Sequence, residues 1–341
     1  MNFSRILIKW YLQHKRDLPW RNTQNPYPIW LSEIMLQQTR VAQGLPYYKA
    51  FTTTFPTVFD LAKASEEQVL KLWQGLGYYS RARNLHKTAQ IIAFEKNGIF
   101  PDNYQDLLKL KGIGDYTAAA IASFSYNEAV PVVDGNVFRV LSRYFDLDHD
   151  IANASNKKIF ASLALELMPK NNPTQFNQAI MEFGALQCVP KNPNCDICVF
   201  NESCAALQKK KVHQLPVKIK KLKIKNRFLN YIIYFDNLGK TIIQKRTEKG
   251  IWQNLYEFPL IETDNEVSID YITENISIQP NIISISELNF DQIIHKLTHQ
   301  KLHIKFWKVY IDGILENGID VDQLKTFPFP IVIYNFIEKE I

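Results

Sequence analysis

Apolar residues recur every three to four positions along most of the first 208 residues, with short breaks at Gly or Pro. This spacing predicts helices that each bury one face. In the opening segment MNFSRILIKWYLQHKR, Arg5 and Lys9 interrupt the apolar positions as the solvent-facing residues of a helix do. Alanine-rich runs such as YTAAAIASF add helical character. The pattern therefore predicts an all-α domain over residues 1–208.

A two-residue period replaces the helical one in the last third of the chain. FLNYIIYF, a turn at 236–239 and TIIQKR predict a hairpin, and LHIKFWKVYI predicts another strand. A short helix is expected around IVIYNFIEKEI. We therefore expect a second domain of the α+β class over residues 227–341.

A strongly basic segment separates the two patterns. Residues 209–227 carry nine Lys or Arg, and no acidic residue occurs between Glu202 and Asp236. This composition predicts a solvated interdomain linker over residues 209–226.

Length and composition agree with two soluble domains. The chain has 341 residues, 46% hydrophobic and 22% charged, and no apolar run approaches the roughly 20 residues of a membrane span. Its start lacks the uninterrupted apolar core of a signal peptide, so a cytoplasmic protein with no membrane partner is expected. The net charge of +6 leaves room for a polyanionic partner.

All four cysteines lie within one 17-residue stretch, CVPKNPNCDICVFNESC. Disulfides are disfavoured in a reducing compartment. Zinc usually takes two separated pairs of ligands, whereas a [4Fe-4S] cluster tolerates uneven loops because each thiolate binds a different iron. The spacing leaves both metals open as interpretations, with the ligands Cys188, Cys195, Cys198 and Cys204.

A glycine-rich turn lies in LLKLKGIGDYTAAAI, between the end of an apolar helix and the start of the next. Gly112 and Gly114 allow a tight turn that leaves amide N–H groups at a helix N-terminus, where a phosphate oxygen can bind. Such a hairpin binds a DNA backbone without reading its sequence. The alternative is an ordinary helical hairpin.

Two carboxylates stand at unusual positions. Asp134 in VVDGNVFRVL precedes a predicted helix, where the helix dipole favours its ionised form, although a plain N-cap is the alternative. Glu33 shares a helix face with Ile29, Leu36 and Gln37, which would raise its pKa, although a solvated surface glutamate is the alternative. Together they form the pair that can cleave an N-glycosidic bond, one as proton donor and one stabilising a cationic sugar.

The hairpin, Asp134 and the cysteine loop resemble the helix-hairpin-helix DNA glycosylases. WLSEIMLQQT and GLGYYSRARNLH resemble the adenine DNA glycosylase branch (MutY type), and the similarity runs almost continuously over residues 1–208. The resemblance implies a [4Fe-4S] cluster on the four cysteines. It also implies a monomer that acts on double-stranded DNA, flips adenine out opposite 8-oxoguanine or guanine, and is nucleoid-associated if bacterial.

The resemblance also assigns roles to residues. Glu33 protonates the base and then activates water, Asp134 stabilises the oxocarbenium ion, Tyr116 supports it, and Asn136 orients Asp134. The adenine pocket is expected from Trp20, Arg21, Leu36 and Gln178, although Trp20 and Leu36 could be plain core. Four residues fall where the family fills the gap in the base stack and contacts the opposing purine, namely Gln38, Thr39, Leu76 and Tyr78.

The second domain resembles the Nudix-like C-terminal domain of the same branch in KGIWQNLYEFPL. The glutamate run of a Nudix hydrolase is missing from IETDNEVSID, so nucleotide hydrolysis is not expected. The family's lesion-reading Phe-Ser-His is replaced by Leu297, Thr298 and His299, which keeps a hydroxyl donor and loses an aromatic ring.

Two rival interpretations remain. A thymine-glycol-type glycosylase with lyase activity shares the fold and the cluster but uses an amine where this chain has Tyr116. A non-catalytic DNA-binding module would keep the hairpin and the cluster, but it would not need both carboxylates.

Overall fold

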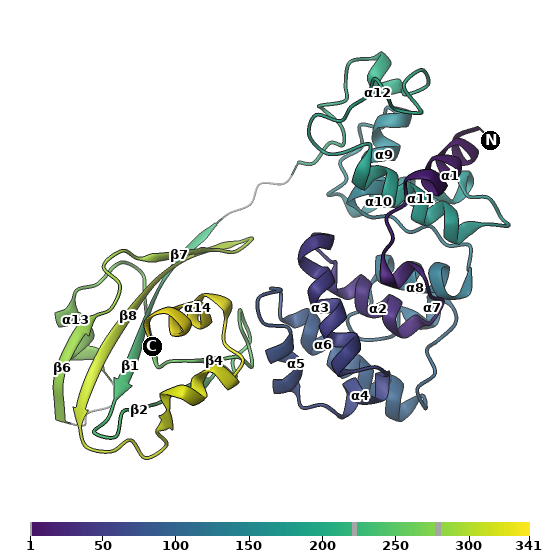
Figure 1. The fold of residues 1–341 in the computed structure, drawn as a ribbon. Helices are drawn as coiled ribbons and strands as arrows, with labels where there is room; N and C mark the ends of the chain where they lie inside the picture. The colour runs from purple at the N-terminus through teal and green to yellow at the C-terminus, as the bar shows by residue number, and fades with distance from the viewer. Residues whose placement is uncertain (1, 220–223, 277–280) are drawn as a thin grey trace. The chain divides into compact units, whose positions relative to one another are not determined.

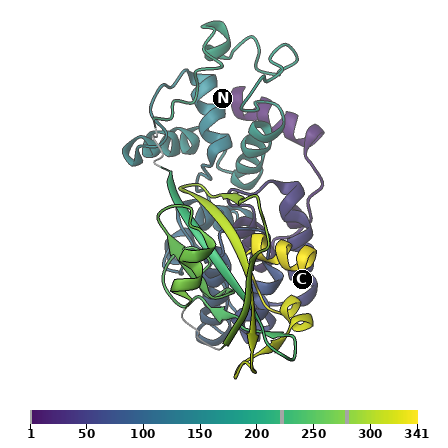
Figure 2. The ribbon, with the colours of Figure 1, turned by 90° about the vertical axis from the view of Figure 1, so that its left-hand side faces the viewer.

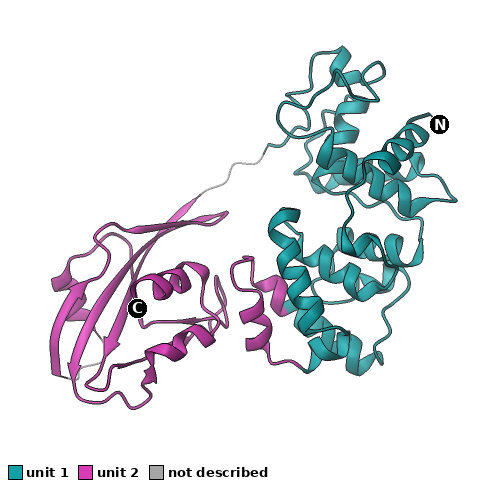
Figure 3. Cartoon of the chain, in the orientation of Figure 1, with its two compact units in different colours: residues 1–63, 84–220 teal, residues 64–83, 221–341 magenta. Residues whose placement is uncertain are grey.

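The computed structural model describes residues 2–219, 224–276 and 281–341. The chain forms two compact units, residues 1–63 with 84–220, and residues 64–83 with 221–341 (Figure 3). The sequence pattern did not indicate that residues 64–83, within the expected all-α domain, would group with the C-terminal part of the chain. No helix among the described residues is long and apolar enough to cross a membrane.

The first unit is built from helices (Figure 1). They are α1 (Asn2–His14), η1 (Pro19–Arg21), α2 (Pro26–Met35), α3 (Val41–Thr54), α4 (Val58–Lys63), most of α6 (Ser80–Gln90), the π-turn η2 (Ile91–Glu95), α7 (Tyr104–Leu107), α8 (Asp115–Tyr126), α9 (Gly135–Phe145), α10 (Ala154–Leu167), α11 (Pro173–Leu186) and α12 (Ala205–Gln208). Helix α11 packs against α1 and α9, around buried aromatic residues that include Phe160, Phe176 and Phe183. Helix α2 packs on α8, which brings two distant sequence motifs together.

The basic segment after residue 208 is not solvated throughout. Val212 and Leu215 are buried, and their carbonyl oxygens accept hydrogen bonds from Arg143 Nε at 3.0 and 3.1 Å. Lys209 and Lys211 form ion pairs with Asp146. The apolar residues within the basic run therefore anchor its first part to the helical unit. Residues 220–223 of the expected linker lie outside the described residues.

The second unit contains α5 (Glu66–Leu72) and a mixed sheet of order β5-β1-β8-β6, with β7 also paired to β8. The strands are β1 (Lys225–Phe235), β5 (Leu260–Thr263), β6 (Asn281–Glu287), β7 (Ile293–Lys296) and β8 (Gln300–Asp312). Strand β8 runs parallel to β1 over the whole length of β1, from Lys225↔Gln300 to Phe235↔Tyr310. Short strands and a 3-10 helix complete the unit, namely β2 (Lys240–Thr241), β3 (Gln244–Lys245), β4 (Tyr256–Glu257), β9 (Ile319–Asp320) and η3 (Val321–Thr326).

Helices cover both faces of this sheet. Helix α13 (Ile269–Asn275) packs on the face that carries Trp307. Phe336 of α14 (Ile331–Glu340) stacks on Phe306 with ring centroids 3.7 Å apart, which places α14 on the other face because side chains alternate along a strand. Figure 2 shows both helices beside the two long strands.

The predicted strand LHIKFWKVYI and the predicted C-terminal helix are confirmed. The predicted hairpin is wrong in its pairing, because β1 bonds β5 and β8, whereas β2 pairs with β9 and β3 with β4. The turn itself is present. The Asp236 carboxylate accepts bonds from the backbone N–H groups of Leu238, Lys240 and Leu315, which directs the chain toward β9 rather than back along β1.

Candidate active site

Glu33 and Tyr116 meet inside the helical unit. Helix α2 begins at Pro26 after the cap residue Asn25 and carries Glu33 near its end, where only 6% of the residue is exposed. Tyr116, in the first turn of α8, donates its hydroxyl to Glu33 Oε2 at 2.6 Å. Burial raises the pKa of Glu33 to about 7, although the Tyr116 hydrogen bond opposes the rise. Glu33 can therefore hold a proton near neutral pH.

Asp134 caps helix α9, and hydrogen bonds hold its carboxylate in place. Oδ1 accepts from the backbone N–H groups of Asn136 and Val137, both at 2.8 Å, and Oδ2 accepts from Asn136 Nδ2 at 2.7 Å. Burial raises the pKa of Asp134, and these bonds oppose the rise. The sequence suggested that the helix N-terminus alone favours the ionised form of Asp134. In the structure, burial opposes this effect by favouring the neutral form.

Asn136 is itself supported by residues that sequence reasoning did not assign. Arg139 Nη2 donates to Asn136 Oδ1 at 2.8 Å. A Cβ atom at Gly184 of α11 would lie 2.7 Å from Asn136 Cβ and 2.9 Å from its carbonyl oxygen, so only glycine fits there. Asn136, in the first turn of α9, is thus held by Arg139 of the same helix and packs closely against Gly184 of α11. The predicted role of orienting Asp134 requires a side chain fixed in this way.

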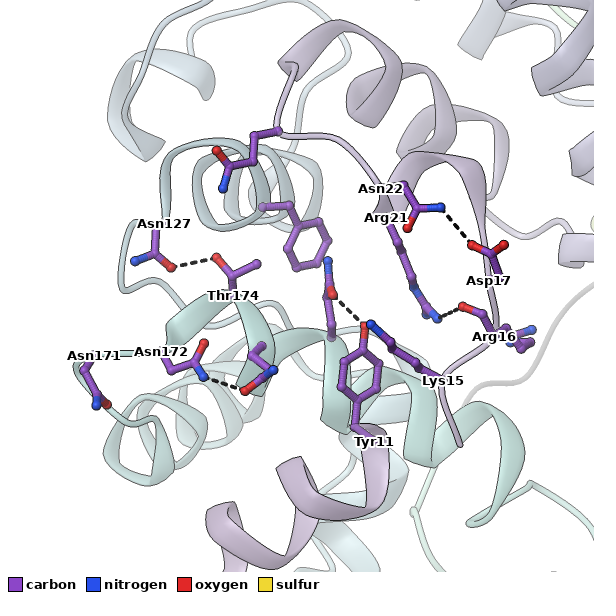
Figure 4. A pocket seen from close by; sticks show the side chains of 14 residues that line it. Tyr11, Lys15, Arg16, Asp17, Arg21, Asn22, Asn127, Asn171, Asn172 and Thr174 are labelled. Atoms are coloured by element: carbon purple, nitrogen blue, oxygen red, sulfur yellow. Dashed lines mark hydrogen bonds between the residues drawn. The ribbon is translucent and has the colours of Figure 1, made fainter. Parts of the chain in front are cut away.

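A cavity of about 620 Å³ lies between α1, the segment after it, the end of α8 and the start of α11 (Figure 4). Its lining is rich in amides and arginines. Among its residues, Tyr11 donates its hydroxyl to Gln178 Oε1 at 2.7 Å. This hydrogen bond occupies one lone pair of the Gln178 amide oxygen and fixes the orientation of the amide in the cavity. Gln178 and Arg21 are the two predicted pocket residues that line it.

Arg21 links this cavity to the carboxylates. It lines the cavity, and its positive charge lowers the pKa of Glu33. Both of its terminal nitrogens donate to Glu182, at 2.9 and 2.7 Å, and Arg16 makes a second bidentate pair with the same carboxylate. Burial alone would raise the pKa of Glu182, but these hydrogen bonds lower it to about 2. Glu182 therefore remains ionised and positions both guanidinium groups.

Trp20 and Leu36 do not line the cavity. Trp20 is buried edge-on against Tyr48, with ring centroids 5.0 Å apart. Leu36 is the C-cap of helix α2 and packs on Gly44. A Cβ atom added to Gly44 would lie only 2.8 Å from Leu36 Cδ2. Trp20 is buried and Leu36 is half-buried in this structure, and their place in the adenine pocket stays a prediction.

The glycine turn takes the expected form. Gly112 has φ +77°, and a Cβ atom there would lie 2.6 Å from Asn84 Cβ, so both its conformation and its surroundings demand glycine. Gly114 is the N-cap of α8, and no side chain of the described residues caps that terminus. The first amides of α8 can therefore bind an anion.

The four cysteines surround one small cavity of about 30 Å³. Their neighbour Arg143 donates to Cys188 Sγ at 3.4 Å. Burial and the charges of the other thiolates raise the pKa of Cys198 to about 11. Four deprotonated cysteines would therefore repel one another unless a positively charged metal centre bound them. Within the described ranges, no three His, Cys, Asp or Glu side chains are gathered closely enough for a single metal ion. Four separate thiols can supply one ligand to each iron of the predicted [4Fe-4S] cluster.

The second unit brings together residues that lie 220 positions apart. The hydroxyl oxygens of Tyr78 and Thr298 are 2.5 Å apart. A cavity of about 410 Å³ is lined by Leu76 and Tyr78 and, from the turn between β7 and β8, by Thr298 and His299. The four residues predicted to fill the gap in the base stack and contact the opposing purine therefore lie in different units, with Leu76 and Tyr78 in the second. Gln38 and Thr39 belong to the first, in the turn after α2, where Gln38 is exposed with φ +55°.

Comparison with known proteins now identifies the family. Residues 31–168 match the HhH-GPD superfamily base excision DNA repair proteins, and residues 230–339 match the NUDIX domain. An adenine DNA glycosylase of Buchnera aphidicola subsp. Schizaphis graminum is 39% identical over 307 residues, covering 89% of this chain and 86% of the relative. The chain belongs to the adenine DNA glycosylase family. The adenine DNA glycosylase of Arabidopsis thaliana is 34% identical over 365 residues, covering 91% of this chain and 58% of the relative.

Among solved structures, a thermostable thymine-DNA glycosylase has 30% identity and a TM-score of 0.56, covering 61% of this chain and 95% of its own. An endonuclease III–DNA complex at 21% identity shares the fold, with a TM-score of 0.54. Together with the two domain matches, these likenesses confirm the predicted fold class, a helical glycosylase domain followed by a Nudix-like domain. Membership of the adenine DNA glycosylase family confirms an enzyme of base excision and disfavours the non-catalytic module.

Proposed function

We propose that this member of the adenine DNA glycosylase family hydrolyses the N-glycosidic bond of adenine mispaired with 8-oxoguanine or guanine. The observation that carries the proposal is the buried Glu33, held by Tyr116 and influenced by the charge of Asp134. A carboxyl group with a pKa of about 7 can give a proton to a leaving base and then accept one from water.

The other residues act on charge and position. Asp134 carries the negative charge that stabilises the oxocarbenium ion, and Asn136 keeps that carboxylate oriented. The flipped adenine binds beside Arg21 and Gln178 at the edge of the cavity, since an amide can bond both N6 and N7 of adenine and the charge of Arg21 acts on Glu33. The amides beside Gly112 and Gly114 hold a DNA phosphate. Tyr116 has no amine, so no Schiff base with the sugar forms and the enzyme is monofunctional.

We propose further that Cys188, Cys195, Cys198 and Cys204 hold a [4Fe-4S] cluster. Their shared cavity, the hydrogen bond from Arg143 to Cys188 and the raised pKa of the Cys198 thiol support this donor set. When bound, such a cluster would pin the loop of residues 188–204 without taking part in hydrolysis.

The purified protein is expected to contain about four irons per chain and to absorb broadly near 400 nm, as this cofactor class does. Cys198→Ser should lower the iron content and the absorbance, because it removes one thiolate. Ser203→Ala in the same loop is the matched control and should leave both unchanged. A colourless protein with one zinc per chain would contradict the cluster.

The second unit is proposed to read the opposing purine. Adenine is a normal base, so the enzyme must recognise its target partly through the other strand. Between them the Tyr78 and Thr298 hydroxyls use one proton for their mutual bond, which leaves one hydroxyl proton and several lone pairs free for a ligand. These groups can bond the N7–H or the O8 of 8-oxoguanine, which guanine lacks.

Thr298→Val should reduce the preference for 8-oxoguanine over guanine by about 5- to 150-fold, corresponding to about 1–3 kcal/mol, because valine keeps the shape and loses the hydroxyl. The measurement is the ratio of single-turnover excision rates on the two mispairs at fixed salt. Thr273→Val on α13 serves as the control. An unchanged ratio in Thr298→Val, with His299→Ala also unchanged, would move lesion reading away from this turn, to Gln38, Thr39, Leu76 and Tyr78.

A further inference from the structure

A pair of like charges lies directly beside the turn that is proposed to read the opposing purine. Lys296 of β7 pairs with Lys301 of β8 in antiparallel register. Leu297 N–H donates to the Gln300 carbonyl at 2.8 Å, so these two residues form a hydrogen-bonded pair. The next pair away from the turn, Lys296 and Lys301, is therefore a non-hydrogen-bonded pair, in which the side chains lie closest. Like charges directly opposite one another destabilise a sheet. The lysine pair therefore lowers the stability of this strand pair instead of adding to it.

No acidic side chain compensates these lysines. Within residues 224–276 and 281–341, neither Lys296 nor Lys301 forms an ion pair, and Glu266 and Glu287 on this part of the sheet bond Lys305 instead. Lys225 begins β1 beside the same turn, where its backbone N–H donates to the His299 carbonyl at 3.0 Å, but its register with Gln300 places its side chain on the opposite face of the sheet. The turn of residues 297–299 is thus flanked by lysines.

The same sheet face is apolar and open next to the lysine pair. His303 stacks on Phe228 with ring centroids 4.5 Å apart, and Ile294 pairs with His303 from the other side. Ile294 is 49% exposed, and Phe290, just before β7, is 93% exposed. Helix α13 covers this face only farther along, where Trp307 is buried. We call the row of Lys296, Lys301, Ile294, His303 and Phe228 the open face.

We propose that the open face binds the backbone of the DNA strand that carries the opposing purine, with Lys296 and Lys301 at its phosphates and the apolar residues against its sugars. This inference rests on the proposed function. Two observations commit it to DNA: the uncompensated positive charge, which complements a polyanion, and the continuity of the open face with the turn at Thr298. These contacts also supply affinity at a turn where Leu297 offers no aromatic ring for stacking.

The test is equilibrium binding of the full-length protein to a duplex with 2′-fluoro-2′-deoxyadenosine, which resists excision, opposite 8-oxoguanine. Binding is measured by fluorescence anisotropy between about 50 and 200 mM salt. Each of Lys296→Gln and Lys301→Gln should lower the slope of log affinity against log salt by about 0.9, and affinity at 0.1 M salt by roughly eightfold. The double variant should show about twice the change in slope.

Lys308→Gln is the matched control. Lys308 lies on the opposite face of β8, with its ammonium 4.7 Å from the Tyr310 ring centre, so its replacement should leave the slope unchanged. The melting temperature of the double variant should equal or exceed that of the wild type, because a repulsion is removed. The ratio of affinities for 8-oxoguanine and guanine duplexes should also stay constant, since phosphate contacts do not read bases.

The outcomes separate the two proposals. If the wild type excises adenine but the double variant keeps its salt slope, the open face does not bind DNA and the proposed function stands. An equal loss of slope in Lys308→Gln would likewise overturn the assignment, because the effect would then be one of net charge. If the wild type excises no adenine from either mispair, the proposed function itself fails, whatever the slopes.

Discussion

Glu33→Gln is expected to lower the single-turnover rate of adenine excision by about 10²- to 10⁴-fold while leaving DNA binding intact. The amide keeps the shape of the side chain and can still accept the Tyr116 hydroxyl, but it cannot give a proton to the base or take one from water. The exposed Glu95 offers a matched control, since Glu95→Gln changes the same charge away from the site. Wild-type rates in Glu33→Gln would show that another group is the acid.

The pH dependence of excision follows from the same carboxyl group. Burial raises the pKa of Glu33 to about 7, so the wild-type rate should fall as pH rises through about 7, where the proton is lost. The remaining activity of Glu33→Gln should lack this step. A wild-type rate that stays constant from pH 5 to 9 would contradict the assigned acid.

Stability gives a readout of Glu33 that does not depend on activity. Because its pKa in the folded protein lies above the ordinary value of 4.5, its contribution to stability is fully present below pH 4.5 and is lost as pH rises through about 7. Glu33→Gln should therefore be more stable than the wild type at pH 8, by about 3 kcal/mol at most, and this gain should vanish toward pH 4. Denaturant unfolding at the two pH values measures the difference.

Asp134→Asn is expected to reduce excision by about 10²- to 10³-fold, because it removes the negative charge that faces the developing cation. Asparagine caps a helix about as well as aspartate, so α9 and the fold should survive. The loss should therefore appear in the single-turnover rate and not in the melting temperature.

Asp150→Asn provides the control for Asp134→Asn. Asp150 also accepts a backbone hydrogen bond, from Ala152 N–H at 2.9 Å, but it lies outside the site. Its replacement should leave the rate unchanged. Excision by Asp134→Asn within a few-fold of the wild type would mean that the carboxylate acts only as a helix cap.

Local sequence patterns predicted the residues whose roles depend on their own helix. The apolar neighbours of Glu33 three and four positions away indicated its burial, and the position of Asp134 before a helix indicated its cap. The glycine turn at Gly112 and Gly114 followed from the need for an unusual backbone conformation. In each case the decisive interaction lies within a few residues along the chain.

Contacts between distant segments were beyond the reach of such patterns. Glu182 bonds Arg21 across 161 positions and Tyr78 meets Thr298 across 220, and nothing in local periodicity fixes those pairs. The parallel pairing of β1 with β8 was missed for the same reason, because a two-residue period identifies a strand but not its partner. The burial of part of the basic segment was not predicted, because Val212 and Leu215 are two apolar residues among many lysines.

The most direct test of the account is single-turnover base release by the full-length protein from duplexes that carry adenine opposite 8-oxoguanine, guanine or thymine, with a thymine glycol duplex alongside. Adenine release should be fast opposite 8-oxoguanine, slower opposite guanine and absent opposite thymine. Thymine glycol should not be released, and the abasic product should break only after added alkali. Excision of thymine glycol with strand cleavage, or adenine release that ignores the opposing base, would contradict the account.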